Sequence, residues 1–177
     1  YPDITHAARF SRIVRMFFAY GDKKIYETRG YYTDPEVFKM FTFPLEKGDP
    51  ETALTNPDSI VITETLAKKY FPGEEPLGKI LRVDEKVDLT VTGVIKDLPQ
   101  NSTLQFNFLI PIERLKEMGQ DLNAWNPNQY LTFILITKNA SYRETEQKIA
   151  QRLKREAPDS QGTLFLHPLI RMHLHSS

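Results

Sequence analysis

The residues with the clearest spacing for chemistry lie from Gly73 to Ile80, in the stretch GEEPLGKI. Two glycines followed by a lysine match a phosphate-binding loop up to its last position, where a Ser or Thr hydroxyl holds magnesium. Ile80 has no hydroxyl, and Pro76 removes one backbone N–H from a loop that cradles phosphates with such groups. Lys79 also leads into a predicted strand, whereas the lysine of a phosphate-binding loop leads into a helix. The sequence therefore argues against a nucleotide site in this loop.

A second pattern that could carry chemistry is the pair His173 and His175 near the end of the chain. On a strand, residues two apart project from the same side, as a pair of metal ligands requires. No third ligand lies nearby in the sequence, and a chain end is normally solvated. We favour an ordinary solvated terminus over a metal site, and we assign no metal ligand and no cofactor.

Serine and carboxylate residues form no pattern typical of catalysis. Ser59, Ser102 and Ser141 lack a Gly-x-Ser-x-Gly context, and no histidine is placed by the sequence to activate them. The acidic pairs Glu74-Glu75 and Asp84-Glu85 fall at predicted turns, where charge serves solubility. A catalytic carboxylate needs a cleft around it. We therefore predict a domain that is not an enzyme, with no catalytic residue.

Aromatic residues gather in two neighbouring segments near the N-terminus. One hypothesis is a surface that binds a partner or a lipophilic ligand. The alternative, which we favour, is that these side chains lie on strand faces packed at a boundary between subdomains. An exposed apolar patch of a few hundred square ångströms would reverse that preference. The candidate partner surface comprises Phe17, Phe18, Tyr20, Tyr31 and Tyr32, with Tyr26 in the same cluster.

Composition narrows the class of protein. Across 177 residues, 23 Lys and Arg are scattered among 23 Asp and Glu, with no basic stripe, which argues against a nucleic-acid partner. The absence of cysteine excludes disulfides and is compatible with either cytoplasm or periplasm. No run approaches the ~20 apolar residues that cross a bilayer. The start, Tyr1-Pro2-Asp3, is neither a signal peptide nor an initiating Met, so we expect a soluble piece of a longer protein.

The elements that would position these residues are organised around one stretch, Ser59 to Val83, which predicts strand, helix, turn and strand. The β-branched residues 60–62 indicate a short buried strand. Thr63 can cap a helix whose apolar residues recur at helical spacing and form one buried stripe. Pro72-Gly73 ends this helix, and a second turn leads into a strand that starts at Lys79.

The flanking segments predict an α+β fold with mixed β-sheets and few helices. One hairpin joins 16–20 to 24–32, and a second joins 79–83 to 89–94. Alternation at 104–110 predicts a half-buried strand, and Tyr130 to Thr137 predicts a strand buried on both faces. Further predictions are a strand within 4–14, a short helix at 34–41 capped by Thr33 or Asp34, a helix at 112–118 and a returning strand at 164–166. A longer helix is predicted at 142–156, capped by Ser141, with Thr145, Ile149 and Leu153 on its inner face.

Several of these segments together resemble a known family. Residues 60–80 resemble part of the periplasmic core domain of MacB/FtsX-type ABC transporter permeases. They run as a buried strand, Thr-Glu, LAKKYF, a turn and PLGKI. VTGVIKDLP at 91–99, then Asn-Ser and FNF at 101–108, resemble the family's next strand, loop and strand. LHPLIRMHL at 166–174 resembles its approach to the second membrane helix. The resemblance covers nearly the whole chain and looks closest to permeases of Bacteroidetes-type bacteria.

The resemblance implies two subdomains. A Porter-like βαβ part would combine residues 1–23 with 112–177, and an inserted β-rich Sabre-like part would span 24–111. The N-terminal part of the Porter-like half would be truncated, which would expose an apolar face and invite dimerisation.

The resemblance also implies a function. The domain would stand on the periplasmic side of the bacterial inner membrane, as part of an integral membrane permease, and would couple ATP hydrolysis in the cytoplasm to movement of a periplasmic substrate or partner (mechanotransmission). The expected partners are a second permease copy, a separate cytoplasmic ATP-binding subunit or domain reached through membrane helices, and a periplasmic or outer-membrane protein. The alternative is a passive periplasmic module that binds a peptide or an amphiphile.

Overall fold

The computed structural model of the chain describes residues 1–124, 130–158 and 162–169. Within these residues, nine strands join in one mixed sheet with four helices around it, which confirms the predicted α+β class. The strands are β1 (Ile4–Ser11), β2 (Val14–Tyr20), β3 (Lys23–Thr33), β4 (Leu45–Gly48), β5 (Ser59–Thr63), β6 (Ile80–Val83), β7 (Val87–Ile95), β8 (Phe108–Pro111) and β9 (Tyr130–Ile136). The helices are α1 (Val37–Met40), α2 (Glu64–Tyr70), α3 (Glu113–Glu117) and α4 (Tyr142–Glu156).

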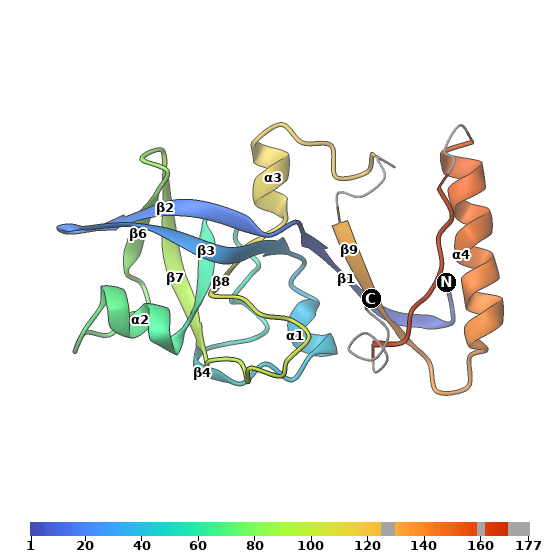
Figure 1. Cartoon of the computed structure of the whole chain (residues 1–177), viewed down its shortest axis with the longest axis horizontal. Helices are drawn as coiled ribbons and strands as arrows, with labels where there is room; N and C mark the ends of the chain where they lie inside the picture. The colour runs from blue at the N-terminus through green and yellow to red at the C-terminus, as the bar shows by residue number, and fades with distance from the viewer. Residues whose placement is uncertain (125–129, 159–161, 170–177) are drawn as a thin grey trace.

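Six of the strands close into a ring. They follow the order β2-β6-β7-β5-β8-β3, and β2 pairs with β3 as well as with β6. The pairs β5–β7 and β3–β8 are parallel, whereas the other pairs of the ring are antiparallel. This closed sheet, with α1, α2, α3 and β4 against it, forms the larger lobe at the left of Figure 1.

Two local features allow the ring to close. Asp84, in the turn between β6 and β7, accepts a hydrogen bond from the backbone N–H of Phe17 at 2.9 Å and donates its own N–H to the Phe17 carbonyl at 2.8 Å. On the opposite side, Gly30 lies against the ring of Phe108, where a Cβ atom would come within 2.0 Å of the aromatic carbons. Glycine at this position therefore lets β3 approach β8 closely.

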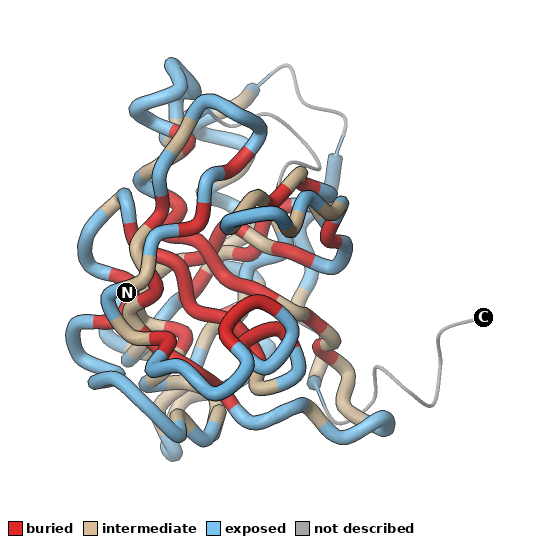
Figure 2. The backbone as a smooth tube through the Cα atoms, turned by 90° about the vertical axis from the view of Figure 1, so that its left-hand side faces the viewer, coloured by how far each residue is buried: buried red, intermediate tan, exposed pale blue. Residues whose placement is uncertain are grey.

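The interior of the closed sheet is an apolar core, and α2 covers it as predicted. Thr63 accepts a hydrogen bond from the Leu66 N–H at 3.4 Å, so the predicted helix cap is confirmed. The buried stripe of α2 consists of Leu66, Ala67 and Tyr70, which pack on Phe18 and the inner faces of β5, β6, β7 and β8. Figure 2 shows the buried segments gathered at the centre of the molecule. The predicted unit of strand, helix, turn and strand is therefore confirmed over residues 59–83.

A smaller lobe extends from the closed sheet (Figure 1, right). It contains β1, β9, α4 and the chain that returns along α4. β9 pairs with β1 from Ile4 to Ser11 and forms one edge of the sheet. The N-terminal residues fasten to α4, because Asp3 pairs with Lys148 at 2.6 Å. Ser141 caps α4 by accepting the Glu144 N–H at 3.4 Å, as predicted.

Two predictions about strand burial are wrong. The segment 104–110 does not form one half-buried strand, because β8 begins only at Phe108 and all four of its residues are buried. Leu104 and Phe106 pack in a second core outside the ring, whereas Phe108 points into the first core. β9 is not buried on both faces, since every one of its residues is half-buried or exposed. A strand at a sheet edge with one neighbour lacks the cover that a central strand receives.

Two predictions about shorter elements also need correction. Residues 164–166 form no strand, because the Leu166 N–H donates to Glu146 Oε1 at 2.8 Å and the Tyr142 hydroxyl donates to the Leu166 carbonyl. Side chains of α4 thus take the backbone groups that a neighbouring strand would need. The helix predicted at 34–41 is one turn at Val37–Met40, and its N-cap is Glu36, without a side-chain cap.

The predicted subdomain boundaries at residues 23 and 111 stay a prediction. The pairing of β2 with β3 and β6, and the packing of Leu115 of α3 in the core of the closed sheet, favour a boundary at the turn between β1 and β2. The larger lobe would then include residues that the sequence assigns to the Porter-like part.

Candidate functional site

The two lobes meet where the end of β1 crosses the end of β3, and an ion pair clamps this junction. Arg9 donates from Nε and Nη2 to the two carboxylate oxygens of Asp34, at 2.9 and 2.8 Å. The backbone N–H of Arg9 donates to the same carboxylate at 2.7 Å. The side chains are 29% and 15% exposed, so solvent screens the pair only in part. The hydrogen bonds that Arg9 donates to Asp34 raise the pKa of Arg9 above its usual value, which keeps the pair charged.

Backbone groups reinforce the same junction. The Arg9 carbonyl accepts hydrogen bonds from the Thr33 hydroxyl at 2.8 Å and from the Asp34 N–H at 3.3 Å. One residue pair further along, the Ser11 hydroxyl accepts the Tyr32 N–H at 3.0 Å. Arg9 also donates to the Leu122 carbonyl at 3.2 Å, which ties in the chain after α3. These contacts hold β1 in a fixed direction relative to the closed sheet.

Aromatic rings pack across the junction on one side of the sheet. Phe10 of β1 is fully buried and meets Tyr31, Phe41 and Phe133 edge to face, with ring centroids 5.5–6.2 Å apart. Phe133 belongs to β9, and Phe41 follows α1, so the cluster joins the smaller lobe to the larger one. Aromatic pairs of this geometry add to the stability that buried area provides.

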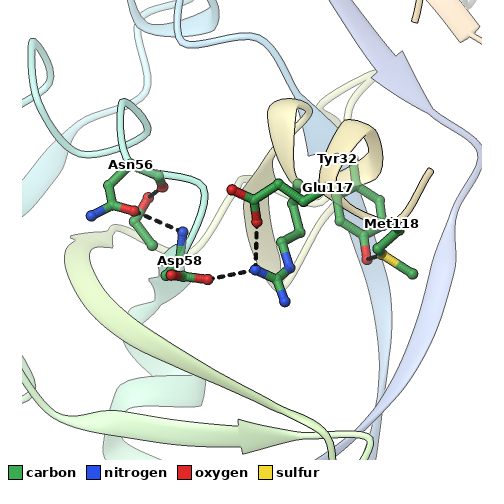
Figure 3. Close-up of polar contacts among 7 residues, drawn as sticks. Tyr32, Asn56, Asp58, Glu117 and Met118 are labelled. Atoms are coloured by element: carbon green, nitrogen blue, oxygen red, sulfur yellow. Dashed lines mark hydrogen bonds and ion pairs between the residues drawn. The ribbon is translucent and has the colours of Figure 1, made fainter. Parts of the chain in front are cut away.

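A second clamp holds α3 against the closed sheet. Arg114 is largely buried, and its Nη1 lies 2.6 Å from Asp58 Oδ1 and 2.7 Å from Glu117 Oε2 (Figure 3). Beside it, the Tyr32 hydroxyl lies 3.9 Å from the sulfur of Met118. Burial, with the charge of Asp84, raises the pKa of Tyr32 to about 12. The phenol therefore stays neutral at physiological pH and serves the packing of α3.

A hollow with aromatic and polar groups in its wall, Lys39 and Thr42 among them, opens beside the junction, over α1 and β4. Its volume is about 380 Å³. The rings of Phe41 and Phe43 stack in its wall with centroids 5.3 Å apart. The half-buried side chains that line it are Phe38, Met40, Phe41, Phe43 and Leu45. Such a lining suits an aliphatic chain or an apolar side chain.

The residues of the candidate partner surface do not lie together. Phe18 and Tyr32 are buried in the core of the closed sheet, so they pack rather than face solvent. Phe17, Tyr20 and Tyr31 are half-buried, and Tyr31 belongs to the aromatic cluster at the junction. Phe17 packs against Tyr26, with the two rings tilted by 59°, and Tyr26, a residue of the same sequence cluster, is 58% exposed. Whether any of these residues binds a partner stays a prediction.

The segment that resembles a phosphate-binding loop carries charges that oppose phosphate. Glu74 pairs with Lys79 and Glu75 pairs with Lys47, each at 2.5 Å. These ion pairs lower the pKa of both carboxyl groups, so both are ionised at neutral pH. Lys79 leads directly into β6, as predicted.

Metal-binding side chains are the remaining candidates for a site. Within the described residues, no three His, Asp or Glu side chains form a group that could hold a metal ion. His173 and His175 lie outside the described residues.

Comparison with protein families identifies the chain. The model of the MacB-like periplasmic core domain matches residues 1–152. The chain belongs to this family. It is a periplasmic domain of a MacB-like ABC transporter permease, and such domains are not enzymes. Among curated proteins, none matches the chain.

Solved structures share the fold of this MacB-like domain. A permease domain from Porphyromonas gingivalis is 24% identical with a TM-score of 0.72, over 97% of this chain and 83% of that one. The periplasmic region of MacB from Actinobacillus actinomycetemcomitans is 18% identical with a TM-score of 0.67, over 88% and 68%. The extracellular domain of the transporter YknZ from Gram-positive bacteria is 16% identical with a TM-score of 0.70, over 93% and 82%.

The family also fixes the setting of the domain in general terms. MacB-like domains belong to membrane transporters and lie outside the cytoplasm, and their permeases work with an ATPase and as dimers. Among the described residues, no helix has both the length and the apolar character needed to cross a bilayer.

Proposed function

We propose that this domain transmits movement from the membrane to the periplasm. ATP binding and hydrolysis by a separate cytoplasmic subunit or domain would shift the membrane helices of two permease copies. The domain would carry that shift to a periplasmic or outer-membrane partner, or to a substrate. This is mechanotransmission, in which the domain performs no reaction of its own.

The junction between the lobes is the observation that carries the proposal. Mechanical coupling requires that force applied to one lobe reach the other without loss in a flexible linker. Here β9 pairs with β1 along its length, and β1 pairs with β3 at Phe10 and Thr33, so the sheet continues from one lobe into the other. The Arg9–Asp34 clamp and the Phe10 cluster fix the crossing. A packed, hydrogen-bonded joint of this kind transmits strain because protein interiors are dense and stiff.

The experiment loosens the joint and leaves the rest of the permease intact. The full-length permease with its ATPase partner, in membranes, would carry Arg9→Met or Asp34→Ala. Spin labels on cysteines introduced at Lys86 and Lys154 report on the two lobes, since both residues are exposed and the chain has no cysteine of its own. The expected result is that ATP hydrolysis persists while the nucleotide-dependent shift of the label at residue 86 shrinks.

A substitution on α2 serves as the control for this experiment. Glu64→Gln changes a carboxylate whose ion pair with Lys68 lies on α2, away from the joint, and should leave the shift unchanged. A shift of full size in the Arg9 and Asp34 variants would show that the joint does not transmit the movement.

A passive binding module is the second candidate, and the hollow at α1 and β4, with aromatic and polar groups in its wall, favours an amphiphile as its ligand. An amphiphile that entered the hollow would contact Phe41 and Phe43. Phe43→Ser should then abolish fluorescence enhancement of N-phenyl-1-naphthylamine by the purified chain, whereas Tyr26→Ser, on another face, should not. Enhancement that is absent in the wild-type chain, or equal in both variants, would exclude this site.

A further inference from the structure

The outer face of the β2–β3 hairpin is an uncovered part of the closed sheet. Arg15, Phe17 and Ala19 alternate with buried residues on β2, and none of the three is buried. On β3, Lys24 and Tyr26 face the same side, because Ala19 pairs with Lys24 and Phe17 pairs with Tyr26. β1, α1 and the aromatic cluster cover this side of the sheet only near the junction. The hairpin itself extends beyond them (Figure 1).

The opposite face of the hairpin is already committed to packing. Glu27, which is buried, accepts hydrogen bonds from Lys69 at 2.6 Å and from the Tyr70 hydroxyl at 2.7 Å. Lys23 donates to the last carbonyls of α2, at 2.6 and 3.1 Å. The hairpin is therefore held firmly from its inner side, and its outer face is presented on a rigid support.

The outer face combines an aromatic pair with positive charge. Phe17 and Tyr26 lie with ring centroids 5.0 Å apart, and the guanidinium of Arg15 stacks over Tyr26 at 4.4 Å. Lys24 follows two residues before Tyr26 on the same strand, beside Ala19. Within the described part of the chain, neither Arg15 nor Lys24 has a carboxylate partner.

Other charged residues around this face differ from Arg15 and Lys24. On β6, Arg82 lies beside Ala19 and is neutralised by Asp88 at 2.9 Å. Asp22 occupies the turn of the hairpin, and Asp84 is engaged with the backbone of Phe17. Among the described residues, Arg15 and Lys24 therefore place two cations without a carboxylate partner beside the aromatic pair.

The spacing of these groups specifies a ligand. Lys24 and Tyr26 are two residues apart on β3, which is about 7 Å on a strand. The pairing of β2 with β3 shifts register between Val14 and Met16, and the Arg15 guanidinium lies over the Tyr26 ring, so the second cation and the aromatic ring share one position. An extended peptide places alternate side chains about 7 Å apart. One carboxylate of such a peptide would face Lys24, and an apolar side chain and a second carboxylate further along would meet the aromatic pair and Arg15.

We infer that the outer face of the β2–β3 hairpin binds an extended acidic segment of a partner protein, in which two acidic side chains flank an apolar one. Rigid aromatic and Arg side chains on a fixed support are typical of residues that dominate binding energy. Tyr26 alone is a small apolar surface for a bilayer, so these charged and aromatic groups suit a peptide better. The inference gives a chemistry to the partner contact in the proposed function and rests on it in that respect.

The test uses the purified chain and a fluorescein-labelled peptide, Gly-Ser-Glu-Ser-Leu-Ser-Glu-Ser-Gly, in a fluorescence-polarisation titration at low salt. We expect saturable binding that weakens when sodium chloride rises from 50 to 500 mM, because salt screens exposed charges. Tyr26→Ser and the double variant Arg15→Gln/Lys24→Gln should each weaken binding by about tenfold or more. Lys154→Gln, which removes an exposed cation on α4, should leave the affinity within about twofold.

Three results would overturn the inference. The first is a peptide with Gln in place of both Glu residues that binds as tightly as the acidic one. The second is binding that the hairpin variants do not weaken although their unfolding midpoints match the wild type. The third is no binding of the peptide together with hairpin-dependent binding of vesicles of anionic phospholipid, which would assign the face to a membrane. Since the titration needs no nucleotide, failure here leaves mechanotransmission intact, and failure of nucleotide-dependent movement leaves this binding intact.

Discussion

The Arg9–Asp34 clamp makes a sharp prediction about stability. Asp34→Ala removes a carboxylate that accepts three hydrogen bonds, from the Arg9 N–H, Nε and Nη2. Hydrogen bonds to charged groups contribute about 1.5–3 kcal/mol each to stability, but these three share one carboxylate and are not additive. The Arg9 guanidinium would also be left partly buried without its counter-ion. We expect Asp34→Ala to lower the free energy of unfolding by about 3 kcal/mol.

The part that belongs to the pair itself is measured by a double-mutant cycle. Arg9→Met keeps most of the apolar side chain and removes the charge, and the cycle combines it with Asp34→Ala. We expect a coupling free energy of about 2 kcal/mol, because the pair is bidentate and mostly shielded. Urea unfolding followed by circular dichroism gives the four free energies, with an unchanged denaturant slope as the sign that the compared states are the same.

A matched exposed pair serves as the control for this cycle. Lys68 and Glu64 are four residues apart on α2, their charged atoms are 3.6 Å apart, and Lys68 is 78% exposed. Exposed pairs of this type couple by about 0.3–0.5 kcal/mol. If the coupling of Arg9 with Asp34 were no larger than that of Lys68 with Glu64, the clamp would not hold the lobes, and the reasoning from its geometry would be refuted.

Three further substitutions test the fold around this joint. Gly30→Ala would place a Cβ against Phe108 and should lower the free energy of unfolding, measured in urea, by about 3 kcal/mol. Gly21→Ala should lower it by only about 1 kcal/mol, because a Cβ there meets no neighbour and only the positive φ is unfavourable. Tyr32 has a pKa of about 12 in the folded protein and loses its proton near pH 10 when the chain is unfolded. Between pH 10 and 12 the unfolding free energy of the wild type should therefore fall by about 2–3 kcal/mol more than that of Tyr32→Phe. Equal pH dependence of the two unfolding free energies, measured in urea, would exclude this. Thr63→Ala removes the cap of α2 and should lower the thermal midpoint by about 2–4 °C, a shift that Thr63→Ser should mostly avoid.

Local sequence signals predicted the part of the fold that depends on neighbouring residues. The run of β-branched residues before Thr63, the apolar stripe of α2 and the turn at residues 84–86 all form as expected. The hairpin of β2 and β3 also forms across Gly21-Asp22. In each case a turn or cap residue and the periodicity point to the same element, so little is left for distant contacts to decide.

Predictions failed where long-range pairing decides. Alternation from Leu104 to Ile110 does not reveal that the segment leaves one core and enters another, nor that β8 has β3 and β5 as neighbours. For β9, an apolar run suits a central strand or an exposed edge equally well. The Leu166 N–H donates to the Glu146 side chain of α4 and so is not available to a neighbouring strand. Strand propensity depends on local residue types and carries no information about such a contact.

The candidate site was predicted only in part. Asp34 was expected as a helix cap, yet its carboxylate binds Arg9, which lies 25 positions away in the sequence. No local pattern marks such a pair, because both residue types are also common on solvated surfaces. The aromatic cluster was found from composition, but its division into buried Phe18 and exposed Tyr26 follows from strand register, and register is set by the closure of the ring.

The central claim is that nucleotide moves this domain through its membrane helices. The most direct measurement cross-links two copies of the full-length permease in membranes with its ATPase, through a single cysteine at Lys154 of α4 or at Lys86 of the closed sheet. Mechanotransmission predicts that the cross-linking yield at both positions changes when ATP is trapped. In a chain that carries both cysteines, the distance between their spin labels should stay the same. Yields at both positions that do not respond to nucleotide, in a preparation that still hydrolyses ATP, would contradict it.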